Sequence, residues 1–145
     1  MGKRWGRTSG ANIPNVRVYV CESCQTWNGA KKPAQCKACG HMNFIHFPSK
    51  AEARRYGELM LEQSRGLISD LKLQSRFPLH AAWQPPDGYQ MQLHKIGEYR
   101  ADFEYTRDGQ RVIEDVKGAM DTPLSAWKRK HAEAEHGVTI QVVRR

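Results

Sequence analysis

The sequence predicts an α/β fold in which a small cysteine-bearing ribbon precedes a larger domain. Two segments carry helix-capping residues at both ends, and the segments between and after them are rich in alternating β-branched and aromatic residues. Two Cys-x-x-Cys pairs lie close together near the amino terminus. From residue 49 onward the expected order of elements is α-β-β-β-α-β.

The first predicted helix occupies residues 49–66. Ser49 is a candidate N-cap, and Glu52 follows three residues later, as in a capping box. Gly66 is a candidate for the left-handed residue that ends a helix. These signals predict where the helix begins and ends.

The second predicted helix has a similar pair of boundaries. Thr122 is its candidate N-cap and Pro123 its first helical residue, a position where proline is favoured. Gly137 is expected to end it. Lys128, Arg129 and Lys130 lie within it and are predicted to contact phosphates, while Trp127 and Leu124 are expected to face the sheet.

The remaining segments are predicted as strands and one loop. Residues 67–79 alternate as an extended strand does, whereas residues 81–96 contain "QPPDG" and are expected to form an exposed loop. The other expected strands are 99–106, 110–117 and 138–143.

A β-hairpin is predicted around Asp108-Gly109, because a type I′ turn needs positive φ at both central positions. If these two residues form the whole loop, Asp102 lies opposite Asp115 and Arg100 lies opposite Lys117. Like charges directly across an antiparallel pair are destabilising. The predicted register therefore brings like charges together, and this repulsion requires a compensating partner.

Side chains alternate between the two faces of a strand. One face of the hairpin is expected to carry Asp102, Glu104, Asp115 and Lys117. The opposite face is expected to carry Ala101, Phe103, Glu114 and Val116. The sequence thus predicts an acidic centre on one face, with a lysine beside it.

Residues 16–48 are predicted to form a zinc ribbon. Each Cys-x-x-Cys pair can fold as a tight turn that directs two thiolates to one point, and two such turns complete a tetrahedral zinc site. The four predicted ligands are Cys21, Cys24, Cys36 and Cys39. Because four thiolates leave no open coordination position, this Zn²⁺ is expected to be structural. Gly40 fits a turn that needs positive φ.

The role of the ribbon has two readings. Lys31, Lys32 and Lys37 are candidate phosphate contacts, and Trp27 is a candidate stacking partner for a base. Alternatively, Trp27 packs the ribbon against the rest of the protein. The sequence leaves both readings open.

Composition bounds the class of protein. The 145 residues carry a formal net charge of +8, which favours a polyanionic partner, nucleic acid before membrane. Simple solubility is the alternative. No apolar run approaches a bilayer-spanning length, and "MGKRWGRTSG" has no signal-peptide core. We therefore expect a cytoplasmic protein with no membrane partner, and a basic flexible arm over residues 1–15.

The acidic centre has a chemical interpretation. Two adjacent carboxylates repel unless one is protonated or a cation lies between them. Mg²⁺ prefers oxygen ligands and would relieve that repulsion. A lysine on the same face could orient a water and stabilise developing negative charge. This set of groups is suited to phosphodiester hydrolysis.

Asp102, followed by Asp115-Val116-Lys117, resembles the D…(D/E)xK core of the PD-(D/E)xK nuclease superfamily, which includes restriction enzymes and Holliday-junction resolvases. More closely, "SKAEARRYGEL", "YRADFEY", "IEDVKG" and "VTIQVV" are similar to a family of small phage-encoded proteins assigned to this superfamily. The resemblance covers about two thirds of the chain. It implies a restriction-endonuclease-like αβββαβ core with a mixed central sheet over residues 49–145.

The resemblance also implies roles for four residues. Asp102 and Asp115 would bind a catalytic Mg²⁺ or Mn²⁺, Glu52 would complete the metal shell, and Lys117 would position the attacking water. Cleavage of DNA would leave 5′-phosphate and 3′-hydroxyl ends, and branched or junction DNA is a candidate substrate. Action on symmetric junctions would imply a homodimer, and a phage protein would act in the cytoplasm of the bacterial host. Ala101 departs from the proline of the motif.

Other acidic residues have simpler interpretations. Glu52 itself could serve only as a helix cap. Glu104 is expected to form an ion pair at the sheet edge rather than to supply a ligand, and Gln74 lies near the expected site without an assigned role. Glu58 and Glu62 are expected to form a solvated helix face with Arg54, Arg55 and Arg65.

Two functions of other classes compete with the nuclease. The first is a non-catalytic, zinc-ribbon nucleic-acid-binding adaptor that retains the nuclease fold; basic charge suits it equally well, but clustered acids do not. The second is a redox or metal-sensing protein, which a closed four-cysteine zinc site disfavours.

Overall fold

The computed structural model describes residues 16–145, so the predicted basic arm at 1–15 lies outside the described residues. The chain divides into two compact units, Met1–Lys50 and Ala51–Arg145. The sequence placed this boundary between residues 48 and 49. Within the described part of the chain, no helix has the combination of length and apolar character needed to cross a membrane.

The first unit is built on a two-stranded antiparallel sheet. Strand β1 (Val18–Cys21) pairs with β2 (Phe44–Phe47), and the ladder runs from Val18 opposite Phe47 to Cys21 opposite Phe44. Val18, Val20 and Phe47 are buried. Cys21 is the last residue of β1, and the other three cysteines lie in the segment between the two strands.

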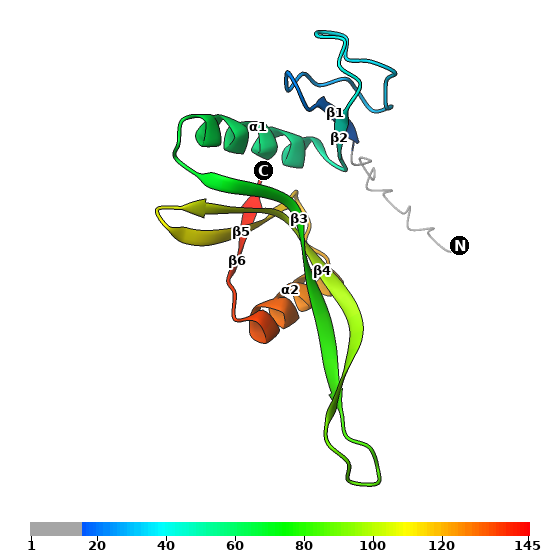
Figure 1. The fold of residues 1–145 in the computed structure, drawn as a ribbon. Coiled ribbons are helices and arrows are strands. Elements are labelled where there is room, and N and C mark those ends of the chain that lie inside the picture. The colour runs from blue at the N-terminus through cyan, green and yellow to red at the C-terminus, as the bar shows by residue number, and fades with distance from the viewer. Residues whose placement is uncertain (1–15) are drawn as a thin grey trace, which may run out of the picture. The chain divides into compact units, whose positions relative to one another are not determined.

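The second unit is a four-stranded mixed sheet with a helix on either side (Figure 1). Its strand order is β3-β4-β5-β6; the first three strands are antiparallel and β6 runs parallel to β5. The elements are α1 (Lys50–Ser64), β3 (Ser69–Trp83), β4 (Gln92–Arg107), β5 (Gln110–Lys117), α2 (Pro123–His136) and β6 (Ile140–Arg144). The predicted α-β-β-β-α-β order and the mixed sheet are therefore present.

The two helices end as their sequences predict. After α1, the backbone N–H of Leu67 bonds to the carbonyl of Glu62, and Gly66 adopts a positive φ of 71°. This is the Schellman arrangement that stops a helix. At α2, the hydroxyl of Thr122 accepts a hydrogen bond from Ser125 N, and Gly137 takes the left-handed conformation.

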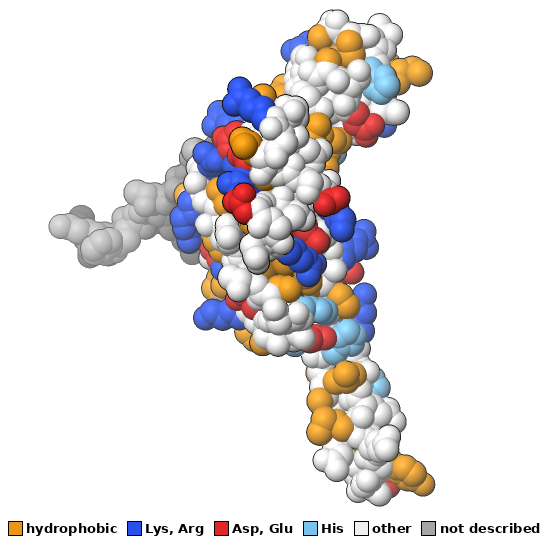
Figure 2. Space-filling view, turned by 60° about the vertical axis from the view of Figure 1, so that its left-hand side comes forward, with side chains coloured by type: hydrophobic (Ala, Val, Ile, Leu, Met, Phe, Trp, Pro, Cys, Tyr) orange, Lys and Arg blue, Asp and Glu red, His pale blue; other side chains and the backbone are white. Residues whose placement is uncertain are grey.

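The prediction of an exposed loop over residues 81–96 is wrong. β3 continues to Trp83 and β4 starts at Gln92, so most of this segment is a hairpin arm that projects from the sheet (Figure 1). The Pro and Gly residues of "QPPDG" occupy the tip, where they block no ladder hydrogen bond. The arm exposes large apolar side chains along its length (Figure 2): Trp83, Tyr89, Met91, Leu93 and Ile96.

The Asp108-Gly109 turn is confirmed, but the predicted pairing beyond it is only partly correct. Arg107 pairs with Gln110, and both turn residues have positive φ. The ladder ends at Phe103 opposite Glu114, so Asp102 and Asp115 do not form a backbone pair, and neither do Arg100 and Lys117. The carboxylate of Asp102 instead accepts a hydrogen bond from Val116 N at 2.7 Å. Beyond the end of the ladder, the Asp102 side chain thus accepts a backbone N–H of β5 in place of a backbone carbonyl of β4.

The main hydrophobic cluster lies between the sheet and α2. It comprises Phe77, Leu79, Tyr99, Ala101, Ile113, Ala132 and Ile140. The prediction that Ala101 shares a face with Glu114 is therefore wrong, because Ala101 packs in the cluster of Ile113, the neighbour of Glu114 on the opposite face. On the adjacent strand, Gln74 has a φ of 57°, and the β3–β4 pairing omits Gln74 and Asp102 but keeps the same register on either side of them.

A buried ion-pair network lies on the α1 side. Glu114 is 2% exposed, and Arg55 donates two hydrogen bonds of 2.8 Å to its carboxylate. Arg55 also contacts Glu58 at 2.9 Å and Glu62 at 3.6 Å. Burial would raise the pKa of Glu114, but the hydrogen bonds from Arg55 and Tyr105 hold it below its ordinary value. The expectation of a fully solvated face was wrong for Arg55, because its partner is a carboxylate inside the fold.

We expect Arg55→Ala to destabilise the protein by about 3–5 kcal/mol, because it leaves the Glu114 carboxylate buried without its cation. Arg54→Ala is the matched control, since Arg54 is exposed on the same helix and its loss should change stability by less than about 0.5 kcal/mol. Urea denaturation of both variants measures the difference. Equal stability of the two variants would contradict the assignment.

Candidate functional site

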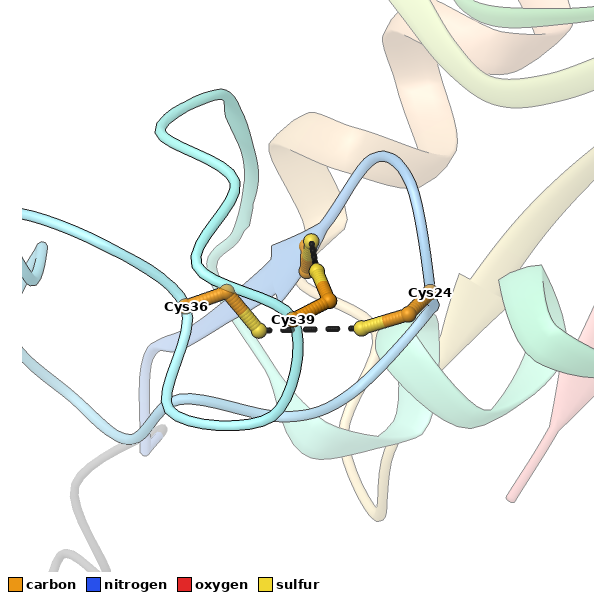
Figure 3. Close-up of side chains that lie close together, drawn as sticks. Cys24, Cys36 and Cys39 are labelled. Carbon is orange, nitrogen blue, oxygen red and sulfur yellow. Dashed lines mark hydrogen bonds between the residues drawn. The ribbon is translucent and has the colours of Figure 1, made fainter.

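Four cysteine sulfurs converge in the first unit. The Sγ atoms of Cys21 and Cys39 lie 3.6 Å apart, as do those of Cys24 and Cys36 (Figure 3). All four lie within 4.8 Å of one another, and none is in a disulfide. Tetrahedral zinc with Zn–S bonds of about 2.3 Å requires sulfurs about 3.8 Å apart. The geometry is that of a four-thiolate site that could hold a zinc ion.

Two equivalent turns present these sulfurs. The N–H of Gln25 bonds to the carbonyl of Cys21 at 3.0 Å, and the N–H of Gly40 bonds to that of Cys36 at 2.9 Å. Gln25 and Gly40 have φ values of 61° and 74°. The sequence predicted the turn at Gly40 but missed its counterpart at Gln25, because glutamine gives no signal for the left-handed conformation.

Hydrogen bonds favour the thiolate form of one ligand. The Sγ of Cys36 accepts from Ala38 N at 3.4 Å and from Asn28 Nδ2 at 3.5 Å. Burial opposes ionisation, yet the backbone donors of Ala38 and Cys39, together with Asn28, lower the pKa of Cys36 to about 6. Thiolate is the form that binds a metal.

The predicted acidic residues come together in the second unit. Asp115 is 2% exposed and Glu52 is 8% exposed. Burial, and then the negative charges of Glu52 and Asp115, raise the pKa of Asp102 to about 8; the hydrogen bond from Val116 N acts in the opposite direction. Three carboxyl groups from α1, β4 and β5 thus influence one another electrostatically.

Asp115 is held by three side chains. Lys117 Nζ lies 3.0 Å from Asp115 Oδ1, and Tyr99 Oη donates to Asp115 Oδ2 at 2.8 Å. Arg129 NH1 lies 3.4 Å from the same oxygen, while its NH2 contacts Asp121 at 2.6 Å. Burial and the nearby Asp115 raise the pKa of Tyr99, so its hydroxyl remains a donor. Sequence reasoning identified Lys117 but missed Tyr99 and Arg129, because only the packing of α2 on the sheet brings Arg129 to this carboxylate.

The acidic residues are less tightly grouped than the cysteines. Among the residues described, only the four cysteines place three or more candidate ligand atoms within 4.8 Å of one another. Around Asp115, part of the negative charge is compensated by Lys117 and Arg129 instead. The acidic site is therefore a group of coupled carboxyls with two cations beside them.

A cleft with a volume of about 280 Å³ opens next to Asp115. Tyr99 and Lys117, which both contact Asp115, form part of its wall, and Arg100 and Lys128 add positive charge. The first turn of α2 completes the lining, with Thr122, Leu124 and Ser125; Glu98 is its acidic member. A cleft of this composition is suited to an anionic group.

The basic residues predicted on α2 occupy three different environments. Lys128 lines the cleft, Lys130 is exposed, and the side chain of Arg129 is only 12% exposed and turned toward Asp115 and Asp121. On the ribbon, Lys31, Lys32 and Lys37 are all exposed. Trp27 is half-buried, and its backbone pairs with that of Val20 in an isolated antiparallel β-bridge within the ribbon.

The expectation that Leu124 and Trp127 face the sheet is wrong. Leu124 is 62% exposed and Trp127 is 54% exposed. The side of α2 that packs on the sheet instead carries Ala132, which is fully buried, and Arg129. A small residue there allows the helix to approach closely, and the arginine gains the buried carboxylate as its partner.

Two further residues lie close to the site without entering it. Glu104 receives hydrogen bonds of 3.0 and 3.1 Å from Arg111, which lower its pKa. The expected ion pair is therefore present, but it joins the two central strands β4 and β5 and does not lie at the sheet edge. Gln74 accepts a hydrogen bond from Arg100 at 3.4 Å.

A family model described as "Protein of unknown function (DUF1064)" matches residues 37–142, well over half of the chain. The matched span contains Glu52, Asp102, Asp115 and Lys117, but only one of the four cysteines, Cys39. Comparisons with curated proteins and with solved structures give no match.

We expect the wild-type protein to bind one zinc ion per chain and Cys36→Ser to lose it, because three thiolates cannot complete the site. Limited proteolysis should then cut within residues 16–48 while the second unit stays intact, since metal binding and folding of so small a ribbon are coupled. Elemental analysis gives the zinc content. Ser23→Ala, which changes a residue between two ligands, should keep both zinc and protease resistance.

The coupled carboxyls predict a pH dependence of stability. In the folded protein Asp102 has a pKa of about 8, against an ordinary value of 3.8, so the folded state retains a proton that the unfolded state releases. Without added divalent metal, the free energy of unfolding should therefore fall as pH rises from about 4 to about 8.

Asp102→Asn should flatten this profile and stabilise the metal-free protein most near pH 8. Asp108→Asn, in the exposed turn, is the matched control and should leave the slope unchanged. Urea denaturation at pH 5 and pH 8 measures both. An unchanged slope in Asp102→Asn would show that this carboxyl does not carry the effect.

Proposed function

The chain belongs to the DUF1064 family of proteins of unknown function, and for this member we propose a divalent-metal-dependent nuclease that hydrolyses phosphodiester bonds in DNA. The observation that carries the proposal is the convergence of Glu52, Asp102 and Asp115, with Lys117 in contact with Asp115. Binding a polyanion does not by itself require buried carboxylates, so their presence beside a basic cleft favours hydrolysis.

The carboxyl groups are chemically suited to a hard divalent cation. Mg²⁺ and Mn²⁺ prefer oxygen ligands, and Asp102, Asp115 and Glu52 would supply them. When bound, such an ion would polarise the scissile phosphate. Burial is the main cause of the raised pKa of Asp102, and the negative charges of Glu52 and Asp115 add to it; a divalent cation would offset that second contribution.

The neighbouring side chains have separable roles in this proposal. The ammonium of Lys117, 3.0 Å from Asp115 and one-fifth exposed, orients the attacking water at the wall of the cleft. Tyr99 and Arg129 fix the position of Asp115. Arg100 and Lys128 receive phosphate groups in the cleft. The products implied by the superfamily resemblance are 5′-phosphate and 3′-hydroxyl ends.

The fold supports the same proposal. The order α1-β3-β4-β5-α2-β6 and the mixed sheet are those expected of a restriction-endonuclease-like core of the PD-(D/E)xK superfamily. The candidate acids lie on the first helix and on the two central strands of the sheet, as that resemblance requires. Phage origin and action in a host cytoplasm belong to this proposal.

The ribbon is proposed as an accessory module stabilised by structural zinc. Its four sulfurs leave no open position for chemistry. Lys31, Lys32 and Lys37 are exposed on it and are candidates for phosphate contacts, consistent with the net charge of +8.

A non-catalytic nucleic-acid-binding adaptor is the second candidate. It is favoured by the two cations at Asp115, since Lys117 and Arg129 compensate that carboxylate without a metal ion. In such a protein the acids would stabilise the fold and the ribbon would bind DNA.

Incubation of the purified protein with Mg²⁺ or Mn²⁺ and linear, single-stranded, flapped and four-way DNA separates these functions. We expect metal-dependent cleavage that Asp115→Asn reduces at least 100-fold, because a metal ion contributes several kcal/mol to transition-state stabilisation. Glu104→Gln is the matched control, an acid of the same sheet that is paired with Arg111, and it should retain most activity.

Cleavage of none of these DNAs by the wild type, or equal cleavage by Asp115→Asn, would reject the nuclease. Salt-sensitive binding that persists without cleavage would then assign the protein to the adaptor class.

A further inference from the structure

One side of α2 carries a row that begins with two exposed apolar residues, Leu124 and Trp127, and continues to the half-buried His131. Leu124, Trp127 and His131 lie three and four residues apart, so they follow one side of the helix. The rings of Trp127 and His131 meet edge to face, with centroids 5.4 Å apart and planes at 88°. The indole is thus supported by a neighbour and still more than half exposed.

This row adjoins the positively charged cleft. Leu124 lies in the cleft wall together with Arg100, Lys117 and Lys128. The acidic member of the lining, Glu98, is accompanied by three cations: Arg76 and Arg100 at 3.7 Å and Lys95 at 3.6 Å. An apolar, aromatic surface and a cationic surface therefore meet at the first turn of α2.

We propose that this combined surface binds an unpaired stretch of DNA, with phosphates in the cleft and a base against Trp127 and Leu124. Proteins that bind single strands combine a basic groove with aromatic side chains that stack on bases. In paired duplex DNA the base faces are stacked on one another and are not available to a side chain. The inference rests on the proposed nuclease and names its substrate class: DNA with unpaired bases beside the cleavage site.

Charge favours a DNA strand over a second copy of the chain as the occupant. Each copy carries a formal net charge of +8, and the surface itself contributes Lys117 and Lys128, so two copies meeting here would place like charges together. A phosphate backbone instead supplies the opposite charge.

Binding can be measured independently of cleavage, by fluorescence anisotropy with Ca²⁺ in place of Mg²⁺. The probes are labelled single-stranded DNA, a fully paired duplex, and the same duplex with an unpaired tail. Trp127→Ala should weaken binding to the single strand and the tailed duplex roughly tenfold, with less than a twofold effect on the paired duplex. Trp127→Phe should restore most of the loss, because an aromatic face is retained.

Trp83→Ala is the matched control, since Trp83 is 49% exposed but lies on the hairpin arm, and it should change none of the three affinities. Lys128→Ala should weaken binding to all three probes and reduce the salt dependence by about one phosphate contact. Together the variants separate stacking on a base from attraction to the backbone.

An equal effect of Trp127→Ala on paired and unpaired DNA, or no effect on either, would overturn the inference. A change in oligomeric state on gel filtration of that variant would also overturn it, in favour of self-association. If the wild type shows the expected preference but never cleaves, the nuclease proposal fails while the binding surface stands. If the wild type cleaves paired duplex as readily as tailed DNA, the nuclease proposal stands and the preference for unpaired DNA is rejected.

Discussion

The repulsion among buried carboxyl groups at the junction of β4 and β5 is the constraint around which the second unit is arranged. Asp102 and Asp115 lie where the β4–β5 ladder ends, and Glu52 approaches from α1. Their negative charge is compensated by a backbone N–H from Val116 and by cations from β5 and α2, and burial together with the neighbouring carboxylates raises the pKa of Asp102 to about 8. Such compensation is needed because burying a charged group is unfavourable in free energy unless a partner offsets it.

Two successive residues of β5, Glu114 and Asp115, are both buried acids with different partners. Glu114 points to α1, where Arg55 and Tyr105 satisfy its carboxylate in a closed network. Asp115 points to the α2 side, where one of its partners, Lys117, also lines an open cleft. The hydrogen bonds from Arg55 and Tyr105 lower the pKa of Glu114, and the negative charge of Asp115 contributes to raising the pKa of Asp102. Alternation along one strand thus directs two neighbouring carboxylates to opposite sides of the sheet, each with its own set of partners.

The ribbon uses the same physical principle in a simpler form. Four sulfurs are held by two equivalent turns at distances that suit one central cation. N–H groups directed at Cys36 lower its pKa to about 6 and prepare a thiolate before any metal arrives. In both units the fold brings negative groups near one another. The four sulfurs surround one point, whereas the carboxyl groups are further apart and a cleft lies beside Asp115.

Local signals in the sequence were sufficient for the order of helices and strands and for the four clustered cysteines. Cap residues predicted both helices, Asp108-Gly109 predicted the hairpin, and the Cys-x-x-Cys spacing predicted the sulfur cluster, because each depends on a few neighbouring residues. Tertiary packing decided which strands pair and which side of each element is buried, because these depend on residues far apart in the sequence. Residues 81–96 form a hairpin arm because β3 and β4 pair along it. Ala101 packs in the cluster of Ile113 and not on the face of Glu114. The side of α2 that carries Arg129 faces Asp115, whereas Trp127 is exposed. Which side of a helix is buried depends on the shape and charge of the surface that it meets, and here a buried carboxylate favoured arginine over tryptophan.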